Sequence, residues 1–173
     1  MRIPTPPDPT TLPDNIVYAQ IHIDAPPEAV WHALTDFERY PLWNSFTLAA
    51  KAQTLVVDAP LTLRVRMRRG FVLNNPERIV LLEPPNAVAW RAENPVWLVR
   101  AVRYQLMQPT TTGTTYITWE QFEGPMVSLM RWIGILGDVQ RGFDTSAADL
   151  KRYVEANPGM RVSEGDTPIA AEG

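Results

Sequence analysis

The stretch from Gly124 to Val154 constrains the fold more than any other part of the chain, because its pattern predicts one long amphipathic helix. At 100° per residue, its large apolar side chains fall on one stripe and its charged side chains fall on the opposite face. Such a helix is about 45 Å long, so it needs a long partner surface. The stripe that we expect to be covered consists of Leu129, Trp132, Ile133, Leu136, Val139, Phe143, Ala147, Leu150 and Val154.

Three glycines and one amide interrupt this pattern. Gly134, Gly137 and Gly142 each lower intrinsic helicity by roughly 1 kcal/mol relative to alanine, which predicts a bend or a close approach of another segment. Gln140 is the polar residue inside the apolar stripe. If the sheet does not press directly on that face, Gln140 would face a cavity.

The composition of the 173-residue chain argues against several classes of function. Its net charge is −3, and no block of basic residues exists beyond the alternation at 64–69, so nucleic acid is a poor candidate partner. The chain has no cysteine and two histidines, His22 and His32. We therefore expect no metal site, no cofactor, no thiol nucleophile and no histidine-based triad.

The sequence predicts one domain with a tail at each end. Residues 1–15 hold five prolines and no apolar core of a signal peptide, so we expect an extended arm and a cytoplasmic protein. Residues 16–156 form the predicted domain, and residues 157–173 form a predicted flexible tail. The most apolar window, 126–136, is too short to span a bilayer.

Between the arm and the long helix, the pattern predicts strands joined by short turns. A strand at 16–24 alternates apolar and polar residues and is followed by short helices at 27–34 and 36–40. Short connections between the later strands imply antiparallel pairing, and a helix laid across the concave side of the sheet follows. The later strands are predicted at 46–53, 61–68, 77–82, 88–93, 98–108 and 114–123.

The order of these elements and several short motifs resemble the START-like superfamily, also called SRPBCC, of polyketide cyclase/dehydrase and lipid-transport domains. The resemblance covers about residues 16–156. It implies an α+β helix-grip fold, in which a curved seven-stranded antiparallel sheet holds a long C-terminal helix and leaves an apolar cavity, with two short helices after the first strand. It rests on IDAPPEAVW at 23–31, LTDF at 34–37, YPLWN at 40–44, AWR at 89–91, RYQL at 103–106, GTT at 113–115 and EQFEG at 120–124.

Glu120 and Arg100 are the candidate catalytic residues. Pairing the last two strands through a turn at 109–113 places Tyr104 near Thr118 and Val102 near Glu120 on one face, with Arg103 on the other. If the first face is concave, Glu120 and Arg100 are diagonal neighbours inside the cavity. They form either a polar anchor or acid/base pair for a ligand, or a structural ion pair at the sheet rim. A slip of one residue reverses both faces.

Most other candidate ligand-binding residues are large side chains that the same pairing turns toward the cavity. For each of them, plain core packing is the alternative interpretation. The family resemblance places Trp43 at the cavity mouth. The full set of predicted ligand-binding residues is Trp43, Trp90, Tyr104, Tyr116, Glu120, Leu136, Gln140 and Phe143.

Two functions from different classes follow. The favoured one is binding of a hydrophobic small molecule, such as a lipid, isoprenoid or polyketide-like aromatic, in the cavity. The alternative is an enzyme of cyclase/dehydratase or hydrolase type that uses Glu120 with Arg100. We expect a monomer or homodimer. Peripheral membrane contact is a minor possibility, carried by apolar residues outside the main stripe: Met126, Val127, Met130 and Ile135.

Overall fold

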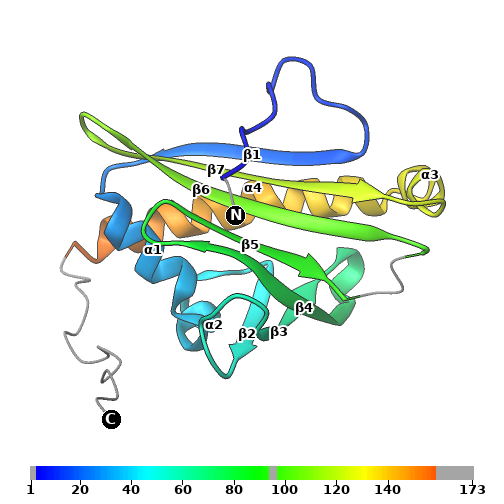
Figure 1. Ribbon diagram of the computed structural model, residues 1–173, viewed down its shortest axis with the longest axis horizontal. Coiled ribbons are helices and arrows are strands. Elements are labelled where there is room, and N and C mark those ends of the chain that lie inside the picture. Colours follow the sequence, from blue (N-terminus) through cyan, green and yellow to red (C-terminus); the bar gives the residue numbers. More distant parts are fainter. Residues whose placement is uncertain (1–2, 94–96, 159–173) are drawn as a thin grey trace, which may run out of the picture.

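The computed structural model describes residues 3–93 and 97–158, which form a curved antiparallel sheet wrapped around a C-terminal helix (Figure 1). The sheet has seven strands in the order β1-β7-β6-β5-β4-β3-β2. The predicted helix-grip fold is confirmed. The strands are β1 (Ile16–Ile23), β2 (Thr47–Ala52), β3 (Pro60–Arg66), β4 (Val72–Glu83), β5 (Ala87–Ala92), β6 (Arg100–Thr110) and β7 (Gly113–Glu123).

Short helices connect β1 to β2, as the sequence predicts. Helix α1 (Pro27–Thr35) begins at a proline, whose fixed φ suits the first helical position, and carries Glu28 in its first turn. The 3₁₀ helix η1 (Phe37–Arg39) and helix α2 (Tyr40–Trp43) follow it. These helices cover one end of the concave face, where Val30, Leu34 and Tyr40 are buried in the core.

The predicted long helix is two helices, which corrects the sequence interpretation. Helix α3 (Val127–Trp132) ends before Gly134, whose φ of 84° is left-handed, and helix α4 (Ile135–Ala156) begins just after it. A left-handed residue stops an α-helix, so the apolar stripe changes phase at this point. Leu129, Trp132 and Ile133 are therefore exposed, whereas the stripe from Leu136 onward is covered.

Strand β4 also departs from the prediction. It begins at Val72 and includes Pro76, whereas the sequence predicts a strand that begins only at residue 77. A 3₁₀ helix, η2 (Arg68–Gly70), makes the turn between β3 and β4. The longer strand extends the sheet toward the end of the molecule that carries α3 (Figure 1), and it places Asn75 on the cavity wall.

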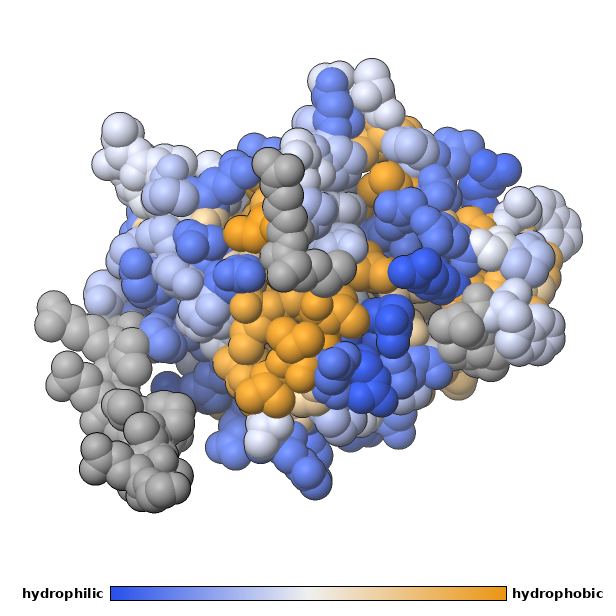
Figure 2. Space-filling model, in the orientation of Figure 1, coloured by the Kyte–Doolittle hydropathy of each residue, from blue (hydrophilic) through white to orange (hydrophobic). Residues whose placement is uncertain are grey.

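Two clusters of buried apolar side chains stabilise the sheet. The larger lies on its concave face, under α1, α2 and α4. The smaller is built on the other face around Leu81, Leu106 and Trp119, with Tyr104 stacked on Trp119 at a ring separation of 5.0 Å. Figure 2 shows an apolar patch on the face in view, over β4 and β5.

The chain outside these elements is irregular where it is described. The arm at 3–15 contains a turn in which Asp8 accepts hydrogen bonds from the main chain and hydroxyl of Thr10. Most of the predicted tail at 157–173 lies outside the described residues.

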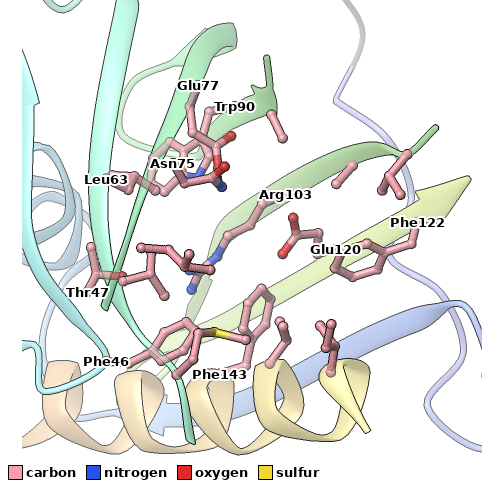
Figure 3. A pocket seen from close by; sticks show the side chains of 18 of the residues that line it. Phe46, Thr47, Leu63, Asn75, Glu77, Trp90, Arg103, Glu120, Phe122 and Phe143 are labelled. Atoms are coloured by element: carbon pink, nitrogen blue, oxygen red, sulfur yellow. Dashed lines mark hydrogen bonds between the residues drawn. The ribbon is translucent and has the colours of Figure 1, made fainter. Parts of the chain in front are cut away.

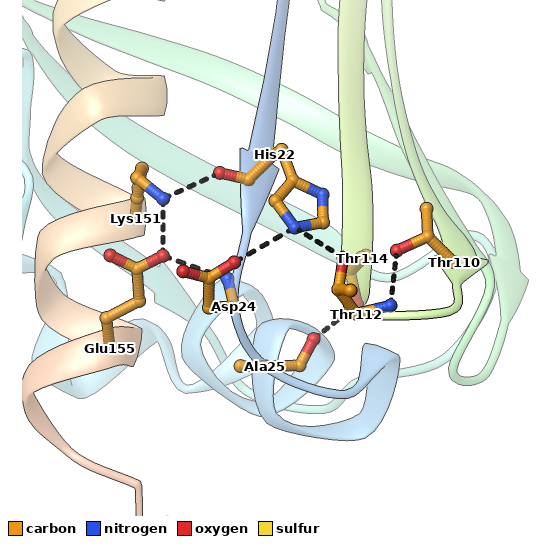
Figure 4. A network of polar contacts seen from close by, with 8 residues as sticks. All are labelled: His22, Asp24, Ala25, Thr110, Thr112, Thr114, Lys151 and Glu155. Atoms are coloured by element: carbon orange, nitrogen blue, oxygen red, sulfur yellow. Dashed lines mark hydrogen bonds and ion pairs between the residues drawn. The ribbon is translucent and has the colours of Figure 1, made fainter.

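A polar network joins the end of β1 to the end of α4 (Figure 4). Lys151 donates a hydrogen bond to the carbonyl of His22 at 2.9 Å, and Glu155 accepts one from the main-chain N–H of Asp24 at 2.8 Å. The Asp24 carboxylate and the Thr112 hydroxyl both contact Nε2 of His22, at 2.9 and 3.3 Å. Because both contacts use the same ring nitrogen, this arrangement is not a catalytic relay.

Candidate ligand-binding site

A cavity of about 170 Å³ lies between the concave face of the sheet and the N-terminal part of α4 (Figure 3). Apolar cavities of about 150 Å³ can hold one benzene molecule, so there is room for about one aromatic ring. Five of the lining side chains are polar: Thr47, Asn75, Glu77, Arg103 and Glu120. The apolar ones are Phe46, Leu63, Val65, Met67, Leu73, Trp90, Ala92, Val99, Ala101, Phe122, Met130, Ile135, Val139 and Phe143.

Arg103 of β6 is the central charged group of this cavity. Only 7% of the residue is exposed, and the guanidinium carbon lies 3.9 Å from the ring centre of Phe143 on α4 and 6.0 Å from that of Trp90 on β5. Its Nε donates a hydrogen bond to the Thr118 hydroxyl at 3.2 Å. These contacts hold the guanidinium against an aromatic face, where its charge is favoured.

Two carboxyl groups share the cavity with Arg103. Glu120 lies directly opposite Arg103 in the β6–β7 register, and Glu77 projects from β4 with 5% of its surface exposed. Glu77 accepts a hydrogen bond from Asn75 at 2.7 Å. In Figure 3, Arg103 and Glu120 extend into the space between Glu77 and Phe143. No ion pair within 4.0 Å joins Arg103 to a carboxylate in the described part of the chain.

Burial shifts the titration of both carboxyl groups upward. Desolvation raises the pKa of Glu120 to about 7, against an opposing effect of the Arg103 charge. Desolvation also raises the pKa of Glu77 well above its ordinary value, and the neighbouring Glu120 adds to that rise. At neutral pH Glu120 is therefore near its titration midpoint, beside the Arg103 guanidinium, and burial favours the protonated form of Glu77 in the same direction.

Buried donors without acceptors also occur here. The indole Nε1 of Trp90, a lining residue, and the amide Nε2 of Gln105 are buried and have no acceptor among the described residues. The Gln105 carbonyl oxygen accepts a hydrogen bond from the Tyr116 hydroxyl at 2.7 Å. Buried donors are nearly always paired, so these two are exceptions, and protein atoms rather than the cavity surround each of them.

The cavity opens toward the end of the molecule that carries α3. Phe46, Trp90 and Phe143 are buried, whereas another group of lining residues is exposed or half-buried. We call this second group the cavity mouth. It consists of Met67, Leu73, Val99, Met130 and Ile135.

Close packing against α4 shapes the inner wall. A Cβ atom on Gly142 would lie 2.3 Å from the Phe46 ring, so only glycine lets Phe46 lie against the helix here. Phe46 in turn meets Phe143 edge to face, with ring centres 6.5 Å apart. The glycine pattern of the sequence predicted such a close approach without identifying which of the three glycines makes it.

The prediction that Arg100 is the neighbour of Glu120 in the cavity is wrong. Arg100 is exposed and lies 3.9 Å from Glu123, outside the cavity. The turn between β6 and β7 contains only two residues between the paired Thr110 and Gly113, which shifts the register by one residue from the predicted one. The shift places Arg103 opposite Glu120.

The same shift moves Tyr104 to the other face of the sheet, where it stacks on Trp119. Tyr104 is therefore not a cavity residue.

The structure divides the other predicted ligand-binding residues into two groups. Trp90, Glu120 and Phe143 line the cavity. The rest surround the cavity without lining it. Trp43 packs on Tyr40 and Tyr153, and Leu136 is buried on α4. Tyr116 donates a hydrogen bond to Gln105, and Gln140 accepts one from the main chain of Tyr18.

Sequence reasoning missed Arg103, Glu77 and Asn75. Arg103 was assigned to the wrong face by the register error. The predicted strand begins only at residue 77, so Asn75 lies outside it and Glu77 is its terminal residue, which gives neither side chain a position on the cavity wall. The alternation Asn75, Glu77, Ile79 was the available signal, since residues two apart share one face of a strand.

No group of three or more histidine and acidic side chains among the described residues could hold a metal ion. No helix in the same part of the chain is both long enough and apolar enough to cross a membrane.

Comparison with known proteins adds a family match. A family model described as polyketide cyclase / dehydrase and lipid transport matches residues 15–155. The "Oxopyrrolidines biosynthesis cluster protein O" of Penicillium oxalicum is 23% identical over 145 residues, which cover 64% of this chain and 72% of that protein.

Similar solved structures share the fold. TTHA0849 from Thermus thermophilus has a TM-score of 0.67 and 16% identity, covering 82% of this chain and 97% of that one. NE0264 from Nitrosomonas europaea has a TM-score of 0.65 and 16% identity, covering 88% and 99%. The di-domain ARO/CYC BexL from the BE-7585A biosynthetic pathway has a TM-score of 0.64 and 12% identity; 87% of this chain matches 52% of BexL, about half its length.

Proposed function

The chain belongs to the family of polyketide cyclase/dehydrase and lipid-transport proteins, with the SRPBCC type of ligand-binding fold, and on that premise we propose that it binds a hydrophobic small molecule between the sheet and α4. The observation that carries this proposal is the cavity itself, in which apolar walls surround Arg103. Ligand sites commonly combine mostly apolar walls with a few polar groups that orient the ligand.

The polar groups narrow the class of ligand. Arg103 is a charged donor that lines the cavity, so the complementary ligand group is an oxygen acceptor such as a carbonyl, phenolate or carboxylate. The cavity volume accommodates about one ring, so a larger ligand would extend through the mouth. A polyketide-like aromatic with one oxygen substituent fits this description better than an unsubstituted hydrocarbon.

Mass spectrometry of protein purified gently from its host tests for a bound compound. A titration with 1-naphthoate tests the orientation of the ligand. We expect Arg103→Met to weaken naphthoate binding by roughly tenfold or more, because a hydrogen bond to a charged group contributes about 1.5–3 kcal/mol. Arg100→Met is the matched control, since Arg100 lies on the same strand outside the cavity.

Two results would overturn this proposal. One is the absence of both a co-purified compound and saturable naphthoate binding in the wild-type protein. The other is an equal weakening of naphthoate binding by the two arginine substitutions, which would mean that naphthoate does not bind in the cavity.

A second candidate function is acid/base catalysis in the same cavity. It is supported by the titration of Glu120 near pH 7 beside Arg103, because a proton-transfer group is most effective when its pKa lies near the working pH. In this role Arg103 polarises a ligand carbonyl, and Glu120 gains or loses one proton. The reaction class is a cyclisation or dehydration of a carbonyl compound, and the residue pair is Glu120 with Arg103.

Incubation with a compound recovered from the host, followed by mass spectrometry of products, tests for turnover. We expect Glu120→Gln to abolish turnover while naphthoate binding persists, and Glu123→Gln to leave turnover unchanged. If the Glu120→Gln variant still turns over the compound, Glu120 is not the acid/base group, and the proposed binding function is unaffected.

A further inference from the structure

Exposed large apolar side chains gather at the cavity mouth. The described residues include ten such side chains, and six of them lie on the three segments that frame the mouth. Trp132 of α3 is 83% exposed, Trp97 before β6 is 73% exposed, and Phe71 after η2 is 63% exposed. The others are Leu73, Leu129 and Ile133. Figure 2 shows apolar atoms at the surface of this end, to the right.

These segments are held together although they are far apart in sequence. The main-chain N–H of Met126, just before α3, donates a hydrogen bond to the carbonyl of Leu98 at 3.2 Å. Gly124 approaches the same carbonyl so closely that a Cβ atom there would lie 2.5 Å from it. Across the mouth, Leu73 and Met130 line the same cavity. The aromatic side chains therefore project from one rim that the fold fixes in place.

A basic cleft of about 290 Å³ lies beside this rim, between η2 and the first turns of α4. Arg66, Arg68 and Arg141 line it, together with one acidic residue, Asp138. Asp138 pairs with Arg141 and lies 3.9 Å from Arg68, so the cleft keeps an excess of positive charge. The whole chain carries a net charge of −3, so the charge of this cleft is opposite in sign to that of the chain as a whole.

We propose that this end of the protein docks on the surface of a membrane that contains anionic phospholipid. The rim aromatics enter the interfacial region, where tryptophan is favoured, and the arginines of the cleft lie against lipid phosphates. The cavity mouth then faces the lipid. This inference does not require the proposed ligand, because docking depends only on the rim and the cleft.

Charge distinguishes a membrane from a second copy of the chain as the occupant. A two-fold dimer interface buries the same patch of both copies, so it would bring two clefts with an excess of positive charge into one interface. An anionic lipid surface has the complementary charge. The apolar side chains also project from three separate segments around an opening, which suits insertion among lipid headgroups.

Sedimentation with vesicles tests the proposal. We expect the full chain to pellet with vesicles of phosphatidylcholine and phosphatidylserine, to pellet much less with phosphatidylcholine alone, and to be released by salt. Trp132→Glu should reduce the partition coefficient by tenfold or more. Leu42→Glu is the matched control, because Leu42 is 71% exposed on α2, away from the rim.

A charge reversal tests the basic cleft separately. Arg66→Glu changes the local charge by two and should lower the partition coefficient roughly thirtyfold. Lys51→Glu on β2 is its control. Circular dichroism of each variant establishes that it is folded.

The proposal is overturned if the wild-type protein does not pellet with the anionic vesicles, or if each control loses binding as much as its paired rim variant. It is also overturned if light scattering shows a dimer that Trp132→Glu dissociates while vesicle binding is absent. Naphthoate binding is measured on the same variants without vesicles, so a failure of docking and a failure of ligand binding are told apart.

Discussion

Gln140 of α4 hydrogen-bonds both main-chain groups of Tyr18 on β1. Its side-chain oxygen accepts from the Tyr18 N–H at 3.1 Å, and its side-chain nitrogen donates to the Tyr18 carbonyl at 2.8 Å. Strand β1 is at the edge of the sheet, so these groups have no neighbouring strand to pair with. One amide on the helix thus takes the place of a strand and joins α4 to the sheet edge. The sequence suggested that Gln140 faces the cavity. The structure instead places its side chain against the main chain of Tyr18.

Replacing Gln140 by alanine should therefore destabilise the fold. We expect the free energy of unfolding to fall by about 1–3 kcal/mol, because two hydrogen bonds are lost and an edge carbonyl and N–H are left without partners. Urea denaturation measures this change, and faster hydrogen exchange at the Tyr18 amide would localise it. Gln121→Ala, at an exposed position on β7, is the control and should change stability by less than about 0.5 kcal/mol.

Glu120→Gln should stabilise the protein in a pH-dependent way. The pKa of Glu120 is raised from 4.5 to about 7 in the folded state. Between pH 4.5 and pH 7, Glu120 is therefore protonated in the folded state and ionised in the unfolded state. Ionisation of Glu120 therefore destabilises the wild-type protein as pH rises through this window. We expect no difference between variant and wild type below pH 4.5, and an advantage for the variant on the order of 3 kcal/mol above pH 7.

Thermal or urea unfolding at several pH values between these limits measures the difference. An advantage that does not change with pH would contradict the assignment, since it would come from packing rather than from the Glu120 proton. Glu77→Gln should show the same direction of change, because the pKa of Glu77 is also raised by burial.

The break between α3 and α4 predicts opposite effects for two neighbouring glycines. Gly134→Ala should destabilise the protein by about 1–2 kcal/mol, because a Cβ atom is unfavourable at a φ of 84° even though the surrounding space is open. Gly137→Ala should stabilise it by up to about 1 kcal/mol, since Gly137 is inside α4 and its added Cβ would lie 3.7 Å from the nearest atom, on Arg141. Urea denaturation of both variants checks the pair. Equal effects would indicate that the helix runs through Gly134 unbroken.

Glu155 should stabilise the fold through its negative charge. The hydrogen bond from the Asp24 main chain, followed by the contact with Lys151, lowers the pKa of Glu155. Its contribution is therefore present above the ordinary value of 4.5 and is lost as pH falls through the lowered value. We expect Glu155→Gln to cost about 0.5–1 kcal/mol at pH 7 and almost nothing in strong acid.

A double-mutant cycle with Lys151→Met separates the charge pair from the main-chain contact. If the two substitutions are additive, the stabilisation comes from the Asp24 hydrogen bond rather than from Lys151. A cost of Glu155→Gln that is as large in strong acid as at pH 7 would contradict the role of the carboxylate charge.

The sequence by itself determined the number of strands, their order along the chain and the fold, but not the break in the C-terminal helical segment at Gly134. Alternation of apolar residues in β1, proline at the start of α1 and the stripe from Leu136 to Val154 are local patterns, and each was specific enough to predict its element. The motifs that resemble the START-like superfamily then related these elements to one architecture. The sequence predicted only part of the candidate site. Of the residues that it placed in the cavity, Trp90, Glu120 and Phe143 line the cavity wall.

Only the tertiary structure decided which arginine faces Glu120 and which apolar residues of the C-terminal segment are covered. A one-residue difference in the β6–β7 turn exchanges the two faces of a strand, so Arg103 rather than Arg100 enters the cavity. A single left-handed residue at Gly134 exposes Trp132 and turns Met130 and Ile135 toward the cavity. Both outcomes depend on how distant segments pack together, and periodicity within one segment carries no information about that packing.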